Sequence, residues 1–178
     1  MIDNFLDEEY FDSLVTLFTN KENSANQCMP WYLDSSVTFS PLHGHVGKEK
    51  NNLFYMYHMI YNENVPMSPF YEKLIPLLEQ FGMRCLIRVK GNLYPNTETL
   101  YEHPMHVDRD FSHSGAILSL NTCDGYTKLK DGTKIDSVAN RMLFFDANEE
   151  HCSTTTTNVP ARININMNYI QEQFHEMI

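Results

Sequence analysis

Residues 100–120 read LYEHPMHVDRDFSHSGAILSL, and the triplet His106-Val107-Asp108 lies near the middle of this stretch. Successive side chains of a β-strand point to opposite faces, so residues two apart share a face. A strand over 101–108 therefore places the imidazole of His106 and the carboxylate of Asp108 on the same side, about 6–7 Å apart along the backbone. This pair predicts half of a divalent metal site.

A third ligand is available further along the chain in His151. Two histidines and one carboxylate on one side of an iron leave its other side open, which is the ligand set of the non-haem Fe(II) oxygenases. Arg162 follows His151 and opens the alternating run RININMNY over 162–169. A guanidinium at this position is suited to pair with the far carboxylate of a bidentate organic acid.

Short strands separated by turns dominate the chain from Met83 onward. Strands are expected over 83–89, 92–94, 101–108, 115–120, 126–130, 133–136, 142–145 and 162–170, and 154–157 is acceptable as strand. The pair Asp131-Gly132 is typical of a type I′ hairpin, which requires positive φ at both central residues. Further strands are expected over 31–39 and in the aromatic segment 53–61, whose tyrosines are candidates for the pocket mouth.

Two helices are expected before these strands. The first covers 7–19, with Asp7 as N-cap and apolar residues at helical spacing. The second starts at Ser68, is kinked at Pro76 and ends at Gly82. Many short strands with two helices predict a mainly β fold, a double-stranded β-helix or jelly-roll barrel supported by the helices on one side.

The layout of H-x-D, a distal histidine and then an arginine about one strand later resembles the Fe(II)- and 2-oxoglutarate-dependent dioxygenases, most of all their prolyl-4-hydroxylase-like branch. The opening Ile2-Asp3-Asn4-Phe5-Leu6 and the segment 88–97 extend this resemblance. The small size of the chain is also similar to that of oxygenases carried by bacterial viruses.

The resemblance implies a reaction and a metal site. Iron(II) is expected on His106, Asp108 and His151, with 2-oxoglutarate as co-substrate and O2 as oxidant. The implied activity is hydroxylation of a C–H bond, coupled to decarboxylation of 2-oxoglutarate to succinate and CO2. The expected substrate is a peptide, with a prolyl-like side chain as the reacting group, or a small molecule.

The resemblance also implies the co-substrate pocket. Arg162 is expected to pair with the distal carboxylate of 2-oxoglutarate, and Tyr94 matches in position a tyrosine that hydrogen-bonds the co-substrate. On strand alternation Asn164 and Asn166 share a face with Arg162 and are expected to line the same pocket. Relatives often carry a second tyrosine on the strand after the H-x-D, but here 115–120 reads GAILSL.

Two other interpretations stay open. A cupin-like barrel that binds a metal or a carboxylate as a sensor or interaction module would use the same ligands. Oxidation of a flipped nucleobase would need a basic entrance. With 23 acidic against 13 basic side chains and a net charge of −10, the composition argues against nucleic acid as a partner.

Length and composition set the remaining expectations. The 178 residues suit a single domain over 1–178, and no stretch reaches the roughly 20 uninterrupted apolar residues of a membrane span. The start shows no secretory signal, so we expect a cytoplasmic protein, in the host cytoplasm if a virus encodes it. Four scattered cysteines, including Cys152 beside His151, predict free thiols rather than a disulfide framework or a further ligand.

Four other histidines have weaker predictions. His43 and His45 form an H-x-H pair in a segment, 41–50, that is expected to be a loop, and solvated side chains are favoured there over a second metal site. His103 and His113 flank the metal strand and are expected in loops near its entrance.

Overall fold

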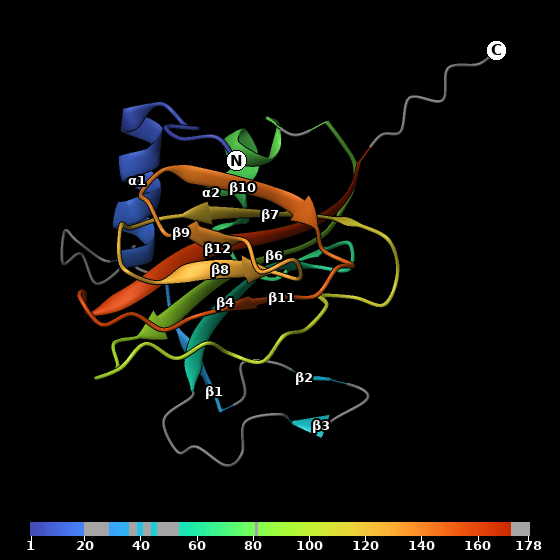
Figure 1. The fold of residues 1–178 in the computed structure, drawn as a ribbon. Helices are drawn as coiled ribbons and strands as arrows, with labels where there is room; N and C mark the ends of the chain where they lie inside the picture. Colours follow the sequence, from blue (N-terminus) through green and yellow to red (C-terminus); the bar gives the residue numbers. More distant parts are fainter. Residues whose placement is uncertain (20–28, 36–38, 41–43, 46–53, 81, 172–178) are drawn as a thin grey trace.

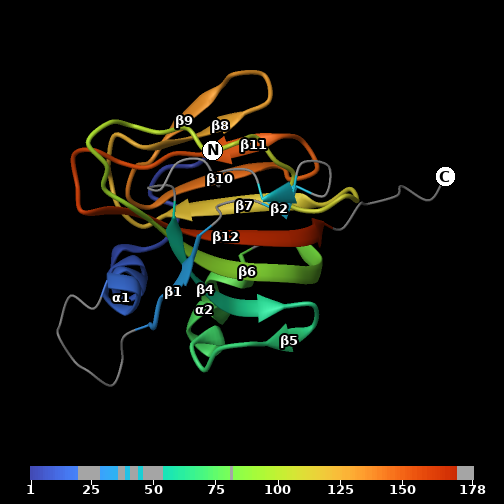
Figure 2. The same cartoon turned by 90° about the horizontal axis from the view of Figure 1, so that it is seen from below.

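The computed structural model describes residues 1–19, 29–35, 39–40, 44–45, 54–80 and 82–171. A seven-stranded sheet has the order β1-β4-β6-β12-β7-β10, with β5 paired to β4, and a three-stranded sheet has the order β11-β8-β9. All pairings between these strands are antiparallel. Figures 1 and 2 show the small sheet on one side of the large sheet and the two helices on the other.

The large sheet consists of β1 (Tyr32–Asp34), β4 (Tyr55–Asn62), β5 (Val65–Pro66), β6 (Met83–Pro95), β7 (Ser114–Ser119), β10 (Arg141–Asp146) and β12 (Ala161–Gln171). The small sheet consists of β8 (Tyr126–Leu129), β9 (Lys134–Asp136) and β11 (His151–Ser153). A separate pair is formed by β2 (Phe39–Ser40) and β3 (Gly44–His45), and the helices are α1 (Glu8–Thr19) and α2 (Tyr71–Leu78).

The central strand β12 is buried on both faces, and its two faces differ in polarity. Ile163, Ile165 and Met167 belong to the apolar core that includes the inner sides of both helices. The alternate residues Arg162 and Asn164 are also buried but face the small sheet. The large sheet therefore has an apolar face against the helices and a polar face inside the barrel.

Helix α1 begins and packs as its sequence predicts. The backbone N–H of Tyr10 donates to the Asp7 carboxylate at 2.9 Å, so Asp7 caps the first turn. Phe18, on the inner side of α1, lies directly over Gly91 of β6. A Cβ built on Gly91 would lie 2.6 Å from a Phe18 ring carbon, so glycine is required for the helix to approach the sheet this closely.

The second helix is shorter than predicted. Ser68 does not cap it, because its hydroxyl hydrogen-bonds the buried His58 ring at 2.7 Å and accepts the N–H of Phe70 at 3.2 Å. Phe70 takes the N-cap position without a side-chain hydrogen bond. The helix includes Pro76 and ends at Leu78, so the predicted end at Gly82 is wrong.

The hairpin predicted at Asp131-Gly132 exists between β8 and β9, but its turn type differs from the prediction. Gly132 has φ of +89°, whereas Asp131 is not among the residues with positive φ, so the turn is not type I′. Two consecutive positive φ values occur instead at Glu63 and Asn64, 47° and 67°, between β4 and β5. Asparagine is enriched at positive φ, so Asn64 is compatible with this turn. Glutamate is not, so Glu63 does not indicate the turn in the sequence.

Several predicted strands change length. The strands predicted over 83–89 and 92–94 form one long strand, β6, and that over 31–39 shortens to β1, with 36–38 outside the described residues. The segments 101–108 and 154–157 form only isolated bridges rather than strands. His43 also lies outside the described residues, and only the backbone of His45 is described. Within the described ranges, no helix is long and apolar enough to cross a membrane.

Replacing Gly91 with alanine tests the contact between α1 and the sheet. The new methyl group would overlap the Phe18 ring, and overpacking in a filled core costs about 1–3 kcal/mol in the free energy of unfolding. Gly82→Ala is the matched control, since no atom lies within 4 Å of its Cβ position. Urea denaturation should separate the two variants, and equal midpoints would contradict the proposed contact.

Candidate metal centre

His106, Asp108 and His151 come together at one end of the barrel, with one ligand atom from each within 4.8 Å of the others. His106 and His151 form an isolated antiparallel bridge, in which each backbone N–H donates to the other carbonyl at 2.9 Å. The prediction that His106 and Asp108 lie on a continuous strand is wrong. The bridge to the start of β11, rather than a regular strand, brings the H-x-D segment to the second histidine.

Both histidines are oriented by backbone carbonyl groups. The Nδ1 of His106 lies 3.2 Å from the carbonyl oxygen of Pro104, and the Nδ1 of His151 lies 3.0 Å from that of Glu149. A carbonyl oxygen only accepts, so each Nδ1 carries the proton and each Nε2 keeps its lone pair for a metal. Burial, and then the nearby His151, lower the pKa of His106 to about 4, which favours the neutral, metal-binding form.

Asp108 is held as a carboxylate by several donors. Arg88 donates from Nη2 to Oδ1 at 2.7 Å, and the Asn168 side chain donates to Oδ2 at 2.8 Å. Burial acts to raise the pKa of Asp108, but Arg88, the two histidines and the Asn168 hydrogen bond together lower it well below its usual value. Oδ2 also lies 3.9 Å from the His151 Nε2, so both ligand atoms face the same small space.

Arg162 is buried inside the barrel without a counterion. Its side chain is 1% exposed, its Nη2 donates to the Thr127 hydroxyl at 2.9 Å, and its guanidinium carbon lies 5.6 Å from the Tyr94 ring centroid. A Cβ on Gly125 would lie 2.7 Å from the Arg162 Cδ, so the backbone of Gly125 closes the space on this side. Among the described residues no carboxylate lies within ion-pair distance of Arg162. Burial lowers the pKa of Arg162, and a bound anion would offset the cost of burying its charge.

The predicted co-substrate residue Tyr94 is buried in a cluster of rings and hydroxyl groups. It packs against the rings of His103 at 5.3 Å and Tyr55 at 5.9 Å. His103 also hydrogen-bonds the Ser153 hydroxyl, and burial, followed by the nearby Arg162, lowers its pKa to about 4. His103 was expected near the entrance but is buried beside Tyr94 instead. His113 is buried as well, and neither belongs to the group of three ligands.

A small cavity of about 20 Å³ inside the barrel contacts His106 and His151 of the triad and also Tyr94 and Thr127, the neighbours of Arg162. Its lining consists of Asn92, Tyr94, His106, Ile117, Thr127, His151, Cys152, Ser153, Asn164 and Asn166. Asn164 accepts a hydrogen bond from Asn92 at 3.0 Å, as a pair across β12 and β6. Ile117 provides the β7 wall, where relatives often carry a tyrosine.

Within the part of the chain that the structure describes, six buried polar atoms lack a hydrogen-bond partner: Arg88 Nε, Asn92 Oδ1, His103 Nε2, Arg162 Nε, Asn166 Oδ1 and Asn168 Oδ1. Buried polar atoms in folded proteins are nearly always partnered. Donors and acceptors are both among the six, so the interior fits a polar ligand better than an apolar one. The two imidazoles and the carboxylate also fit a divalent transition metal.

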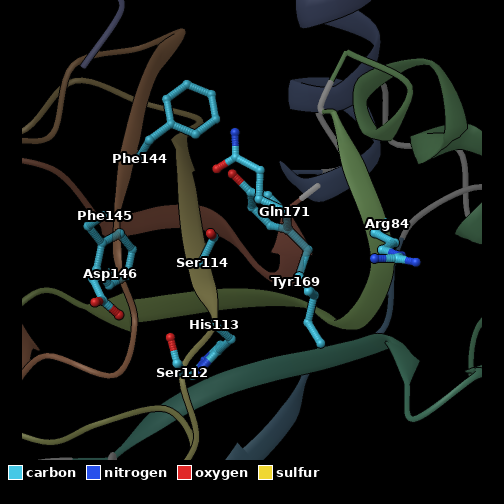
Figure 3. A pocket seen from close by; sticks show the side chains of 10 residues that line it. Arg84, Ser112, His113, Ser114, Phe144, Phe145, Asp146, Tyr169 and Gln171 are labelled. Carbon is cyan, nitrogen blue, oxygen red and sulfur yellow. The ribbon is translucent and has the colours of Figure 1, made fainter. Parts of the chain in front are cut away.

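A wider groove has a volume of about 980 Å³, and Figure 3 shows the side chains that line it. It is lined by Arg84, Ser112, His113, Ser114, Phe144, Phe145, Asp146, Tyr169, Ile170 and Gln171. Phe145 separates the groove from the triad and packs edge-on against His151, with ring centroids 4.7 Å apart. His113 contacts Asn168, the donor to Asp108, at 3.3 Å. The groove therefore adjoins the candidate metal centre through Phe145, which contacts His151, and through His113, which contacts a hydrogen-bond donor to Asp108.

Sequence reasoning identified Tyr94 but missed the other residues on the same face of β6. Arg88, Lys90, Asn92 and Tyr94 lie two apart on one face, opposite Asn168, Asn166, Asn164 and Arg162 of β12 respectively. The sequence carries a signal for them, because polar residues recur at every second position from Arg88 to Tyr94 of β6 as they do over 162–169. The prediction of two separate strands, ending at Val89 and starting at Asn92, interrupted this alternation.

The comparisons place this geometry among known folds. No protein-family model matches the chain, and no curated protein matches it. A Pseudomonas putida prolyl-4-hydroxylase structure matches with a TM-score of 0.59 at 15% identity, covering 96% of this chain and 91% of that one. The chain has the fold of the prolyl-4-hydroxylases.

Two further structures agree with this prolyl-4-hydroxylase fold. A Trichoplax adhaerens prolyl hydroxylase, in complex with a peptide fragment, matches with a TM-score of 0.61 at 16% identity, covering 96% and 82% of the two chains. A 2OG-Fe(II) oxygenase family member from Burkholderia pseudomallei gives 0.62 at 12% identity, covering 97% and 84%. The predicted double-stranded β-helix with helices on one side is therefore confirmed.

The Arg88–Asp108 pair should be energetically coupled in the metal-free protein. Asp108→Asn leaves a largely buried guanidinium facing a neutral group and should cost about 3 kcal/mol in the free energy of unfolding at pH 7. In an Arg88→Met background the same substitution should cost much less. A double-mutant cycle by urea denaturation measures the difference, and additive effects would contradict the coupling.

The stabilisation by Asp108 should also depend on pH. Its pKa in the folded protein lies below the unfolded value of about 3.9, so its contribution is complete above about pH 5 and is lost as the pH falls further. The stability difference between the wild type and Asp108→Asn should therefore shrink between pH 5 and pH 3. A difference that stays constant over this range would contradict the lowered pKa.

Proposed function

We propose that this protein is an Fe(II)- and 2-oxoglutarate-dependent oxygenase that hydroxylates a C–H bond. The observation that carries the proposal is the buried, counterion-free Arg162 in the same interior as three ligand atoms that lie within 4.8 Å of one another. 2-Oxoglutarate offers a carboxylate for the cation and a 2-oxo acid group for the metal. The prolyl-4-hydroxylase fold supports the assignment.

Each group in the interior has a role in this proposal. The Nε2 atoms of His106 and His151 and the carboxylate of Asp108 would hold iron(II), which supplies the reduction of O2 that couples decarboxylation of 2-oxoglutarate to hydroxylation. Arg88 keeps Asp108 ionised and fixes its orientation. Arg162 binds the distal carboxylate of the co-substrate.

The residues around Arg162 would strengthen its contact with the distal carboxylate of 2-oxoglutarate. Thr127 orients the guanidinium through its hydroxyl, and Tyr94 covers one side of it and offers a hydroxyl to the co-substrate. Asn164 lies one cross-strand pair nearer the metal and lines the path between them. Because the site is buried, water competes little for these hydrogen bonds.

We propose that a peptide or small-molecule substrate enters along the groove in Figure 3. The Trichoplax prolyl hydroxylase is in complex with a peptide, which supports an extended ligand beside this fold. Val107 and Phe111, 37% and 45% exposed, offer apolar contacts on the loop that carries Asp108. A prolyl-like side chain is the first reacting group to test.

Succinate formation tests the proposed reaction. The purified protein should convert 2-oxoglutarate to succinate only when iron(II), O2 and the co-substrate are all present, and Asp108→Ala should abolish conversion because it removes one of three ligands. Conversion is measured by quantifying succinate with and without candidate peptides. An iron-loaded, folded protein that never forms succinate would instead favour the cupin-like sensor.

Arg162→Met tests the co-substrate site. The variant cannot make the two charge-assisted hydrogen bonds proposed between the buried guanidinium and the distal carboxylate. The dissociation constant for 2-oxoglutarate should therefore rise about 100-fold. Lys130→Met, which removes an exposed partner of Glu149, is the control and should leave the affinity unchanged. Isothermal titration in the absence of O2 measures both, and equal affinities would contradict the role of Arg162.

A further inference from the structure

Lys90 lies on the inner face of β6 near the triad and has no role in the proposed reaction. It pairs across the sheet with Asn166, whose side chain donates to Asp108 at 3.4 Å, and it is two residues from Arg88 on the same face. Its ammonium lies 3.5 Å from the Tyr55 hydroxyl and 5.3 Å from the centroid of the Tyr55 ring. Lys90 is therefore on the β4 side of the metal centre, apart from Arg162.

The described residues provide no close counterion for Lys90. Among the described residues no carboxylate lies within ion-pair distance of its ammonium; Asp34 and Asp108 act on it only from further away. The surroundings are unfavourable for its charge, because burial, followed by the nearby Arg88, lowers its pKa to about 7. Lys90 as a whole residue is partly exposed.

The charges of the interior do not balance after iron and co-substrate are added. Arg88, Lys90 and Arg162, when protonated, carry three positive charges, and Asp108 carries one negative charge. Ferrous iron and the 2-oxoglutarate dianion cancel each other and leave this excess unchanged. One further anionic group near Lys90 would reduce it.

We propose that the substrate carries a carboxylate, which Lys90 and the Tyr55 hydroxyl bind on the β4 side of the metal centre. This inference rests on the proposed oxygenase function and narrows its substrate class. One ammonium and one hydroxyl match the two oxygens of a carboxylate. The proposal favours a free carboxylic or amino acid, or a peptide with an acidic group beside the reacting carbon, over a prolyl residue in a neutral peptide.

Acetate is the probe for this carboxylate site, and acetamide, which has a similar shape but no charge, is the control ligand. The protein is saturated with iron(II) and 2-oxoglutarate without O2, so that Arg162 is occupied, and its thermal midpoint is followed as each probe is added. Acetate at about ten times its dissociation constant should raise the midpoint by about 3 °C, and acetamide should not. Lys90→Met should abolish the rise, while Lys90→Arg and the β9 surface control Lys134→Met should keep it.

The outcomes separate this inference from the proposed function. An equal effect of acetate and acetamide, a rise that survives in Lys90→Met, or a response to inorganic phosphate but not to acetate would overturn the carboxylate site. Lys90→Met weakening 2-oxoglutarate as much as Arg162→Met would make Lys90 a co-substrate ligand and would also overturn it. If the iron complex does not form, the proposed function fails, and the acetate titration of the metal-free protein in an Arg162→Met background still tests Lys90.

Discussion

The constraint on which the rest of the structure depends is the burial of a polar surface inside the barrel. β6 and β12 present Ile, Met, Val and Gly residues to the helices, and Arg, Lys, Asn and Tyr residues to the interior. Burial of the first, apolar surface stabilises the fold through the hydrophobic effect. Burial of the second, polar surface opposes folding unless its groups are hydrogen-bonded, and several of its buried atoms have no partner among the described residues. A polar ligand between these strands and the small sheet would remove that cost.

This constraint accounts for the arrangement of the site. Arg88 and Asn168 compensate the carboxylate of Asp108 at the triad, whereas Arg162 at the far end has only neutral partners. Asp108 is thus paired at the triad, whereas Arg162 and Lys90 have no carboxylate within ion-pair distance among the described residues. The backbone bridge between His106 and His151 joins the H-x-D segment to β11 of the small sheet, so backbone contacts of the fold hold the candidate ligands together.

Most of the fold and the main candidate residues could be predicted because they rest on local patterns. The alternation of 162–169 placed Arg162 and Asn164 on one face, and the spacing around Asp7 and Phe11 gave α1. The H-x-D pattern predicted the positions of His106 and Asp108, but the strand expected to hold them does not form. The segment that contains Pro104 makes an isolated bridge instead. The contacts of Arg88 with Asp108 and of Ser68 with His58 join distant segments, and no local pattern reports them.

We propose that the interior binds one ligand by its two ends, at the triad and at Arg162. The most direct measurement is an anaerobic titration of the iron(II) protein that compares 2-oxoglutarate with pyruvate, which has the 2-oxo acid group but no distal carboxylate. The visible charge-transfer band of the chelate should appear with both, but at far higher concentrations of pyruvate, and Arg162→Met should remove this difference. No band, or equal affinities for the two acids in the wild type, would contradict the account.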